Sequence, residues 1–265
     1  MPTELDKKAK ASFGFIENFF GKYNVPWWIE AGTALSLNRD GKILEWDHDV
    51  DIAIWYDDLP AYKEWCLSFE GSPFEVIFQK GLPYLDNIIQ LRVKSKFRHI
   101  FVDIDVYLYK RSAGKAYMRW LHNPVGLFSK SKRFALICLA ELHMPRSERW
   151  KKRSAWFPRS ITSASFWLYI KIYMATTSCR YHQFDEEMFL ELKPISFQGM
   201  KLLISARTDD YLSHRYGSDW RSPDPQFNQR GRWRNSKARP VLKMNVLSYP
   251  IAIRDFASKT RDQHG

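Results

Sequence analysis

The feature that most constrains this chain is an acidic stretch that runs directly into an apolar one. Residues 46–55 read WDHDVDIAIW, so Asp47, Asp49 and Asp51 are spaced by two before the apolar run. In a strand, residues two apart lie on the same face. The spacing therefore predicts a strand over 49–55 whose carboxylates share one face, while the alternate apolar residues face another layer.

Carboxylates on one strand face repel one another unless a cation lies between them. Asp-rich segments are most often turns or solvated faces, but a solvated face would not normally continue into Ile-Ala-Ile-Trp. The oxygen ligands of Asp49 and Asp51 suit a hard divalent cation such as Mg²⁺, which proteins commonly bind together with substrate phosphates. The pattern indicates phosphate chemistry, with Asp47 orienting the loop or a metal-bound water and His48 on the opposite side of the strand.

A turn of small residues precedes the acidic stretch. The run Trp27–Ala31 predicts a short buried strand, and Gly32 then turns the chain into a short helix over 34–38 that Thr33 can cap. Such a turn at a helix N-terminus can present backbone N–H groups to a phosphate. The alternative is that Gly32 serves only the turn.

A second acidic pair lies on a long predicted strand. Residues 100–109 read IFVDIDVYLY, in which Asp103 and Asp105 share one face. Half-buried carboxylates are costly unless a cation pairs with them. Either they bond to neighbouring Lys or Arg side chains, or one of them completes the metal site that Asp49 and Asp51 begin.

The remaining pattern predicts a single domain, residues 1–265, with a core over 10–110 and 184–225, an insertion over 111–183 and a basic C-terminal tail over 222–265. Hydrophobic periodicity and turn residues predict helices over 4–22, 59–69 and 211–216, the last started by Thr208, strands over 74–78 and 88–93, and two strands around Gly199 within 184–204. Residues 111–160 read as mixed loops and short elements.

The composition limits the kinds of binding partner and the cellular compartment that we expect for this protein. The formal charge of +12 and the pI near 9.5 favour an anionic partner. The three cysteines have no CxxC spacing, which argues against a disulfide framework or a zinc site. The N-terminus lacks an apolar signal core, and no apolar run is long enough to span a bilayer. These features favour a cytoplasmic protein.

The quoted segments resemble a known family. GTALSLNR followed by ILEWDHDVDIAI is similar to the signature of the LicD/fukutin-related phosphotransferases, within the DNA polymerase β-like nucleotidyltransferase superfamily. VDIDVYLY resembles the family's third acidic strand, with Asp105 as the best match. The segment from Pro194 to Gly217 resembles its closing hairpin and Tyr-Gly helix. Unlike many fukutin-related members, this chain has no cysteine cluster and no membrane anchor, which favours a soluble bacterial enzyme.

The resemblance implies an α+β fold: a nucleotidyltransferase-like mixed β-sheet core flanked by helices, with a family-specific insertion and C-terminal segment. It implies transfer of phosphocholine, ribitol phosphate or glycerol phosphate from a CDP-linked alcohol to a glycan hydroxyl. The residues expected to bind Mg²⁺ or Mn²⁺ and to act in catalysis are Asp49, Asp51 and Asp105, the last also as a candidate general base. The residues expected to bind the donor are Gly32, Thr33, Arg39 and Lys42, although Lys42 could equally be a solvated charge.

Two other functions remain open. A nucleotidyltransferase would use the same carboxylates to transfer NMP from an NTP and would release pyrophosphate instead of CMP. A non-enzymatic nucleic-acid-binding module would explain the charge, but the chain has no recognised nucleic-acid motif and such binding needs no acidic strand pair. We expect the basic surface instead to hold a glycan, a lipid-linked glycan acceptor or the anionic inner face of the membrane, where the protein would be peripheral.

Overall fold

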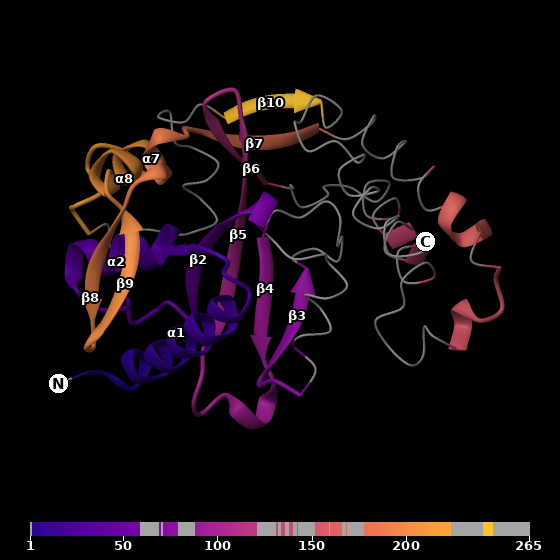
Figure 1. Cartoon of the computed structure of the whole chain (residues 1–265), viewed down its shortest axis with the longest axis horizontal. Helices are drawn as coiled ribbons and strands as arrows, with labels where there is room; N and C mark the ends of the chain where they lie inside the picture. The colour runs from indigo at the N-terminus through magenta and orange to yellow at the C-terminus, as the bar shows by residue number, and fades with distance from the viewer. Residues whose placement is uncertain are drawn as a thin grey trace. The chain divides into compact units, whose positions relative to one another are not determined.

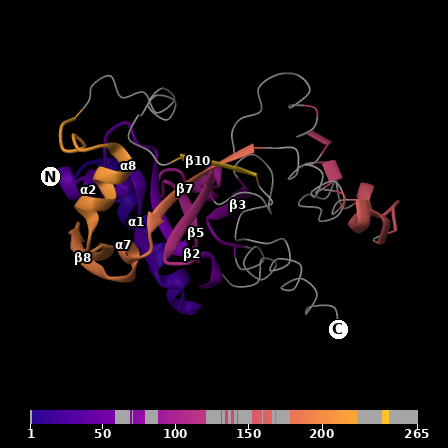
Figure 2. The same ribbon diagram turned by 90° about the horizontal axis from the view of Figure 1, so that it is seen from above.

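In the computed structural model, the described residues are 2–58, 69, 71–78, 88–120, 178–223 and 241–245, with short pieces between 131 and 168. The chain divides into two compact units, of which the first comprises residues 1–77, 87–118 and 182–241. This first unit contains all the residues predicted for the site. Figures 1 and 2 show its elements from two directions.

The first helix, α1 (Glu4–Lys22), has the amphipathic spacing predicted for it. A capping box closes its N-terminus, because the N–H groups of Thr3 and Asp6 each donate to the other's side chain at 3.0 Å. Its inner face is fully buried and consists of Ala9, Phe13, Ile16 and Phe20. The ring of Phe13 stacks on that of Trp27 with 6.4 Å between centroids, so the helix packs on the first strand.

The core of the first unit is a mixed sheet with a parallel pair at its centre. Its strands are β1 (Trp27–Ile29), β2 (Asp49–Trp55), β3 (Phe74–Phe78), β4 (Ile88–Val93), β5 (Asp103–Ser112), β6 (Lys115–Trp120) and β7 (Ser178–Asp185). The order is β1-β2-β5-β6-β7, with β4 also paired to β5 and β3 to β4. Strands β2 and β5 are parallel, whereas β1, β4 and β6 pair antiparallel. The predicted α+β class with a mixed sheet is confirmed.

The second acidic strand is displaced from its predicted range of 100–109. It begins at Asp103, because the short helix η3 (Ser95–Phe97) and a turn precede it. The backbone N–H and carbonyl groups of Val102 are hydrogen-bonded to the Ser12 hydroxyl group and not to a neighbouring strand. It continues to Ser112, where Ala113 and Gly114 adopt positive φ angles of 49° and 72° and reverse the chain into β6. This hairpin falls inside the region predicted as an insertion.

The helix after the first strand is longer than predicted. α2 (Ala31–Asp40) begins three residues before the predicted range of 34–38 and ends two residues after it. The prediction that Thr33 caps this helix is wrong, because Thr33 lies inside the first turn. Its hydroxyl group accepts the N–H of Asp51 at 2.8 Å, so a contact with β2 replaces the cap. Gly41 ends the helix in the left-handed conformation (φ 67°) that favours glycine.

The closing segment forms a hairpin and a helix beside α2 (Figure 1). The segment begins with the end of β7 at Asp185, and the short helix α7 (Glu187–Leu190) follows. The predicted hairpin around Gly199 is confirmed as β8 (Leu192–Phe197) and β9 (Met200–Ser205). The predicted final helix is confirmed as α8 (Thr208–Tyr216), and the side chains of Asn38 and Asp209 join it to α2 at 3.4 Å.

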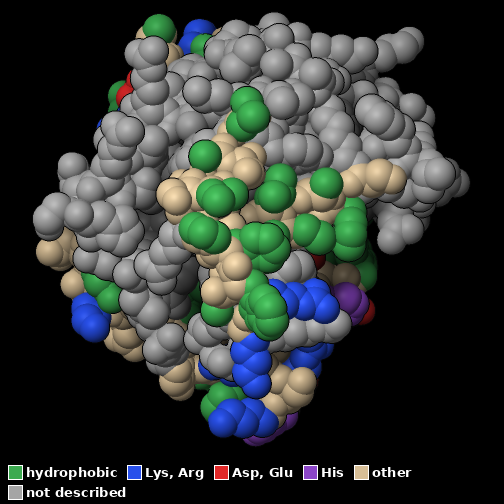
Figure 3. Space-filling model, turned by 90° about the vertical axis from the view of Figure 1, so that its right-hand side faces the viewer, with side chains coloured by type: hydrophobic (Ala, Val, Ile, Leu, Met, Phe, Trp, Pro, Cys, Tyr) green, Lys and Arg blue, Asp and Glu red, His purple; other side chains and the backbone are tan. Residues whose placement is uncertain are grey.

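The second unit comprises residues 78–86, 119–181 and 242–265. Its described pieces expose large apolar side chains, including Phe134, Trp156 and Leu168 at 68, 86 and 61%. Figure 3 shows hydrophobic side chains gathered on one face of the molecule, with Lys and Arg side chains below them. Among the described residues, no helix combines the length and low polarity needed to cross a bilayer.

Two further elements complete the description, η1 (Tyr56–Asp58) after β2 and β10 (Val241–Asn245). The predicted helix over 59–69 and most of the basic tail lie outside the described residues. The single-domain organisation and the limits of the insertion therefore stay predictions.

Candidate active site

Parallel pairing of β2 and β5 brings the two acidic pairs together. Asp49 lies opposite Asp103, and Asp51 lies opposite Asp105. Paired strands are about 4.8 Å apart, so the four carboxylates gather at the N-terminal ends of the two strands. Asp51 and Asp105 are only 7% and 6% exposed. The structure thus places the three predicted catalytic carboxylates, Asp49, Asp51 and Asp105, in one cluster.

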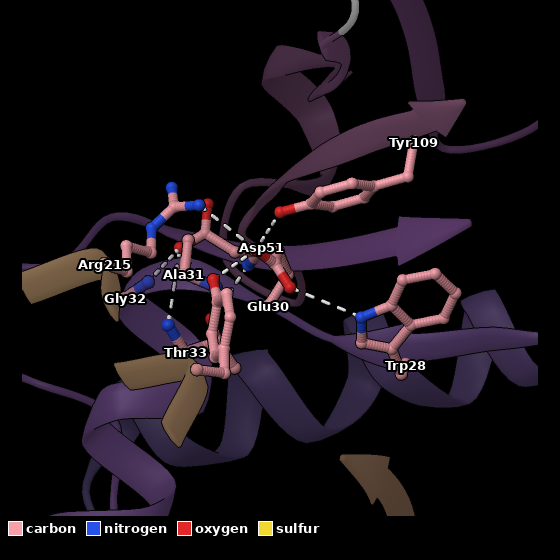
Figure 4. A network of polar contacts seen from close by, with 9 residues as sticks. Trp28, Glu30, Ala31, Gly32, Thr33, Asp51, Tyr109 and Arg215 are labelled. Atoms are coloured by element: carbon pink, nitrogen blue, oxygen red, sulfur yellow. Dashed lines mark hydrogen bonds and ion pairs between the residues drawn. The ribbon is translucent and has the colours of Figure 1, made fainter. Parts of the chain in front are cut away.

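The first turn of α2 holds one of these carboxylates (Figure 4). Oδ2 of Asp51 accepts the N–H of Gly32 at 2.9 Å and the N–H of Thr33 at 3.3 Å. A helix N-terminus attracts anions because its first N–H groups have no partner within the helix and carry a positive dipole end. Here these N–H groups bind a carboxylate of the protein itself. Direct contact of Gly32 and Thr33 with a donor phosphate stays a prediction.

Gly32 is also the residue whose missing side chain makes room for the acidic cluster. A Cβ atom at this position would lie 3.1 Å from Oδ2 of Asp47 and 3.1 Å from Oδ2 of Asp51. Both distances are shorter than ordinary van der Waals contact. The prediction that Gly32 forms a turn before the helix is wrong, because it lies inside the first turn of α2; the glycine serves the close approach of this helix to two carboxylates.

Asp47 joins the cluster although it precedes β2. Its side chain is 8% exposed, and its carboxyl group hydrogen-bonds with that of Asp49. Burial, and then the charges of Asp49 and Asp105, raise the pKa of Asp47 to about 8. Burial and the like charges of Asp49 and Asp47 also raise the pKa of Asp51 well above its usual range. Full ionisation of the cluster is therefore unfavourable in these surroundings.

Asp103 and Asp105, left undecided by sequence, have different partners. Oδ1 of Asp103 accepts the backbone N–H of Val93 at 2.8 Å, which ties it to β4. Oδ1 of Asp105 accepts a hydrogen bond from the Gln90 side chain at 3.0 Å. Asp105 is the more buried of the two and interacts with Asp51 and Asp47. His48 is exposed, as expected for a residue facing away.

The donor chemistry of the cluster suits a divalent cation. All its ligands are carboxylate oxygens, which Mg²⁺ and Mn²⁺ prefer, and their mutual repulsion is what a cation would relieve. Within the described part of the chain, no three carboxylate, imidazole or thiol groups already converge on one metal position. Mg²⁺ is commonly held by one or two carboxylates with substrate phosphates and water. The assignment of Asp49, Asp51 and Asp105 as ligands stays a prediction.

The two positively charged side chains that were predicted to bind the donor lie away from the acidic cluster. Arg39 is in the last turn of α2, about 12 Å along the helix from Ala31 at 1.5 Å per residue. Its guanidinium group pairs with Asp40 at 2.7 Å and donates to the carbonyl of Trp220 at 3.5 Å. Lys42 is exposed and lies 3.9 Å from Glu45. The structure does not bring either side chain to the carboxylates, and their contact with a donor stays a prediction.

A buried charge that sequence reasoning missed lies directly before α2. Glu30 is fully buried, and its Oε1 atom accepts hydrogen bonds from the hydroxyl groups of Tyr109 (2.7 Å) and Tyr211. Oε2 accepts from the indole N–H of Trp28 at 3.3 Å. Burial raises the pKa of Glu30, and the charge of Arg215 opposes that rise. The only hint in the sequence is a charged residue between an apolar run and small residues.

Arg215 on α8 is the counterion of Glu30. Its Nη1 atom lies 3.1 Å from Oε1 of Glu30, and its side chain is 1% exposed. The guanidinium group also lies 5.4 to 6.0 Å from the ring centroids of Tyr107, Tyr211 and Tyr216. Its charge acts on the pKa of Asp51, which it lowers. The closing segment therefore contributes a charge to the site.

Two proteins are similar to this chain in sequence. An uncharacterised protein of Rickettsia typhi is 32% identical over 108 residues, which cover 37% of this chain and 34% of that protein. One from Rickettsia prowazekii is 26% identical over 165 residues, covering 52% and 62%. The chain thus matches about one third and three fifths of the length of these relatives.

Solved structures give weaker similarity. A lincomycin-bound lincosamide antibiotic adenylyltransferase, LnuA, is 10% identical with a TM-score of 0.39, covering 80% of this chain and 94% of that one. ANT(2")-Ia in complex with adenylyl-2"-tobramycin is 16% identical with a TM-score of 0.28, covering 40% and 53%. The family assignment therefore depends on the sequence.

A family model does match the sequence. Residues 24–134 correspond to the domain described as LicD/FKTN/FKRP, nucleotidyltransferase domain. This range contains the first turn of α2 and both acidic strands, and it leaves out the closing segment. The part of the chain that holds the acidic cluster is therefore similar to the LicD/FKTN/FKRP family of nucleotidyltransferase domains.

Proposed function

We propose that this protein is a metal-dependent transferase that moves a phospho-alcohol group from a CDP-linked donor to a hydroxyl group of a cell-surface glycan. The transferred group would be phosphocholine or a polyol phosphate such as ribitol or glycerol phosphate. The observation that carries the proposal is the cluster of the buried Asp47, Asp51 and Asp105 with the half-buried Asp49, within the residues that match the family model.

The residues have separable roles in this proposal. Asp49 and Asp51 would hold Mg²⁺ or Mn²⁺, which would neutralise the diphosphate of the donor. The N–H groups of Gly32 and Thr33 keep one oxygen of Asp51 engaged, so its other oxygen would be the metal ligand. Asp105, oriented by Gln90, would be either a further ligand or the general base. Phosphoryl transfer depends mainly on such alignment and charge neutralisation.

The reaction would proceed by in-line displacement. The acceptor hydroxyl oxygen forms a bond to the phosphorus that carries the alcohol. The bond from that phosphorus to the oxygen it shares with CMP breaks, and CMP leaves with the electron pair. If Asp105 is the general base, it takes the proton of the acceptor hydroxyl group.

A second candidate is nucleotidyl transfer from an NTP, which the description of the matched family domain favours. The acidic cluster would serve both reactions, so the leaving group separates them. A CDP-alcohol donor gives CMP, whereas an NTP gives pyrophosphate. The acceptor in the first case would be a glycan or a lipid-linked glycan, and a cytoplasmic protein at the inner membrane face would meet such acceptors.

A thermal-shift screen tests the donor. The protein is heated with CDP-choline, CDP-ribitol, CDP-glycerol or CTP, each with Mg²⁺ and with EDTA. A ligand at 100 times its Kd stabilises a fold by about 2.7 kcal/mol. We expect a rise in Tm with one CDP-alcohol and Mg²⁺ that is absent in EDTA. A rise with CTP alone would replace the proposal with nucleotidyl transfer.

A further inference from the structure

Tyr211 joins the buried Glu30–Arg215 pair to the first turn of α2. Its hydroxyl group donates a hydrogen bond to the carboxylate of Glu30 and accepts one from the backbone N–H of Ala31 at 3.2 Å. The next residue, Gly32, donates its own N–H to Asp51 at 2.9 Å. One hydroxyl group from α8 therefore acts on the backbone that orients the central carboxylate.

The backbone at this junction is strained. Ala31 has a φ angle of 47°, in the left-handed region that residues with a side chain rarely adopt. Such a conformation persists only where its surroundings hold it, and it is common at functional sites. The holding contacts are the Tyr211 hydroxyl group on Ala31 and two backbone bonds of Glu30, to Asp51 at 3.0 Å and from Ala34 at 2.9 Å.

We infer that Tyr211 is a positioning residue for the cation site: its hydroxyl group fixes Ala31, and through it the N–H pair of Gly32 and Thr33 that orients Asp51. The inference rests on the proposed function, because it assigns Asp51 to a cation. The family match ends at residue 134, so this role comes from a segment outside the matched domain.

The chain offers a matched control for this role. Tyr109 also donates its hydroxyl group to Oε1 of Glu30, at 2.7 Å, and its ring is also fully buried. In the described contacts, only the Tyr211 hydroxyl group also bonds to Ala31. Both phenylalanine variants keep a ring, and that of Tyr211 packs against Phe184 and Phe189 with centroids 5.6 and 5.5 Å apart. Each variant therefore removes one bond to Glu30, and Tyr211→Phe also frees Ala31.

The test compares Tyr211→Phe with Tyr109→Phe in the full chain. Amide hydrogen exchange reports on Gly32 and Thr33 without any ligand, and Mn²⁺ binding is measured by electron paramagnetic resonance. Changing a residue that orients a metal ligand typically weakens metal affinity by roughly 10- to 100-fold. We expect that loss, with faster exchange at both amides, in Tyr211→Phe. Tyr109→Phe should remain within about twofold of wild type in both measurements while losing similar stability.

Equal effects of the two variants would overturn the inference, because they would show general loosening of the core. Faster exchange in Tyr211→Phe with unchanged Mn²⁺ affinity would also overturn it. If the wild type binds no Mn²⁺, the proposed function fails. The exchange comparison then still decides whether Tyr211 fixes the two amides.

Discussion

Asp51 is the residue on which the site's contacts converge. Two amides of α2 bond to its side chain, its own N–H is bonded to Thr33, and its neighbours are other carboxylates. The spacing of Asp47, Asp49 and Asp51 was enough to predict a shared face. It could not show that Gly32 touches two of these carboxylates, because that proximity depends on how α2 packs against β2.

Gly32→Ala tests this close approach. The added Cβ would push on Oδ2 of Asp47 and of Asp51, each 3.1 Å away, so we expect turnover to fall by roughly tenfold or more (a cost of about 1.4 kcal/mol or more in activation). Gly14→Ala is the control, because a Cβ there meets nothing within 4 Å. Turnover and circular dichroism are measured for both variants. Equal turnover in the two would show that the cluster tolerates the methyl group.

Asp47 gives a prediction on pH. Its pKa is about 8 in the metal-free fold and near 3.8 when unfolded, so between these values the folded state binds more protons than the unfolded state. Stability therefore falls as pH rises from about 4 to 8. We expect Tm without metal to decrease over this range, and less steeply in Asp47→Asn. Mg²⁺ should raise the wild-type Tm more at pH 8 than at pH 6, and the reverse order would contradict a cation in this cluster.

At the scale of elements, α8 is fastened to the start of α2 by the buried pair of Arg215 and Glu30. Sequence analysis found both helices but began α2 three residues late. The helix starts at Ala31 because Glu30 and Tyr211 fix the preceding backbone, and those partners are 181 residues apart. Alternating apolar residues defined β2 and β4 well, since each strand's pattern is local. The pairing of Glu30 with Arg215 has no local signal.

Arg215→Met tests the fastening. Removing one partner of a buried ion pair leaves the other charge uncompensated and typically costs about 3–5 kcal/mol. We expect a loss of this size in the free energy of unfolding, measured with urea. Arg221→Met is the control, because its ion pair with Asp209 is about 60% exposed on both sides and such pairs contribute about 1 kcal/mol or less. Equal losses would mean that α8 is not held by the Glu30 pair.

For the whole molecule, the sequence predicted the fold class, the family resemblance and the two acidic strands, but not that these strands pair in parallel. The sequence did not predict the second unit. The net charge of +12 indicates only that the partner is anionic. Exposed Trp156 and Phe157, at 86 and 50%, follow the basic residues Lys152 and Arg153. Aromatic and basic side chains in this combination are typical of contact with an anionic membrane surface.

That surface can be tested with vesicles. Each Lys or Arg near an anionic surface contributes about 1 kcal/mol to binding. We expect co-sedimentation with vesicles of 30% phosphatidylserine in phosphatidylcholine, about tenfold weaker binding to phosphatidylcholine alone (near 1.4 kcal/mol), and a decrease with added salt. Trp156→Ser with Phe157→Ser should reduce binding to the anionic vesicles. Equal binding to both vesicle types would rule out the charge-based contact.

The most direct measurement of the central claim is CMP release from a CDP-alcohol by wild type and by Asp51→Asn. Asparagine keeps the shape of the side chain but removes the charge that would hold the cation. With Mg²⁺ and a glycan acceptor, we predict CMP release by wild type and a rate lower by roughly 1,000-fold (about 4 kcal/mol) in the variant, with unchanged circular dichroism. Wild-type rates of CMP release in a folded Asp51→Asn protein would contradict the account.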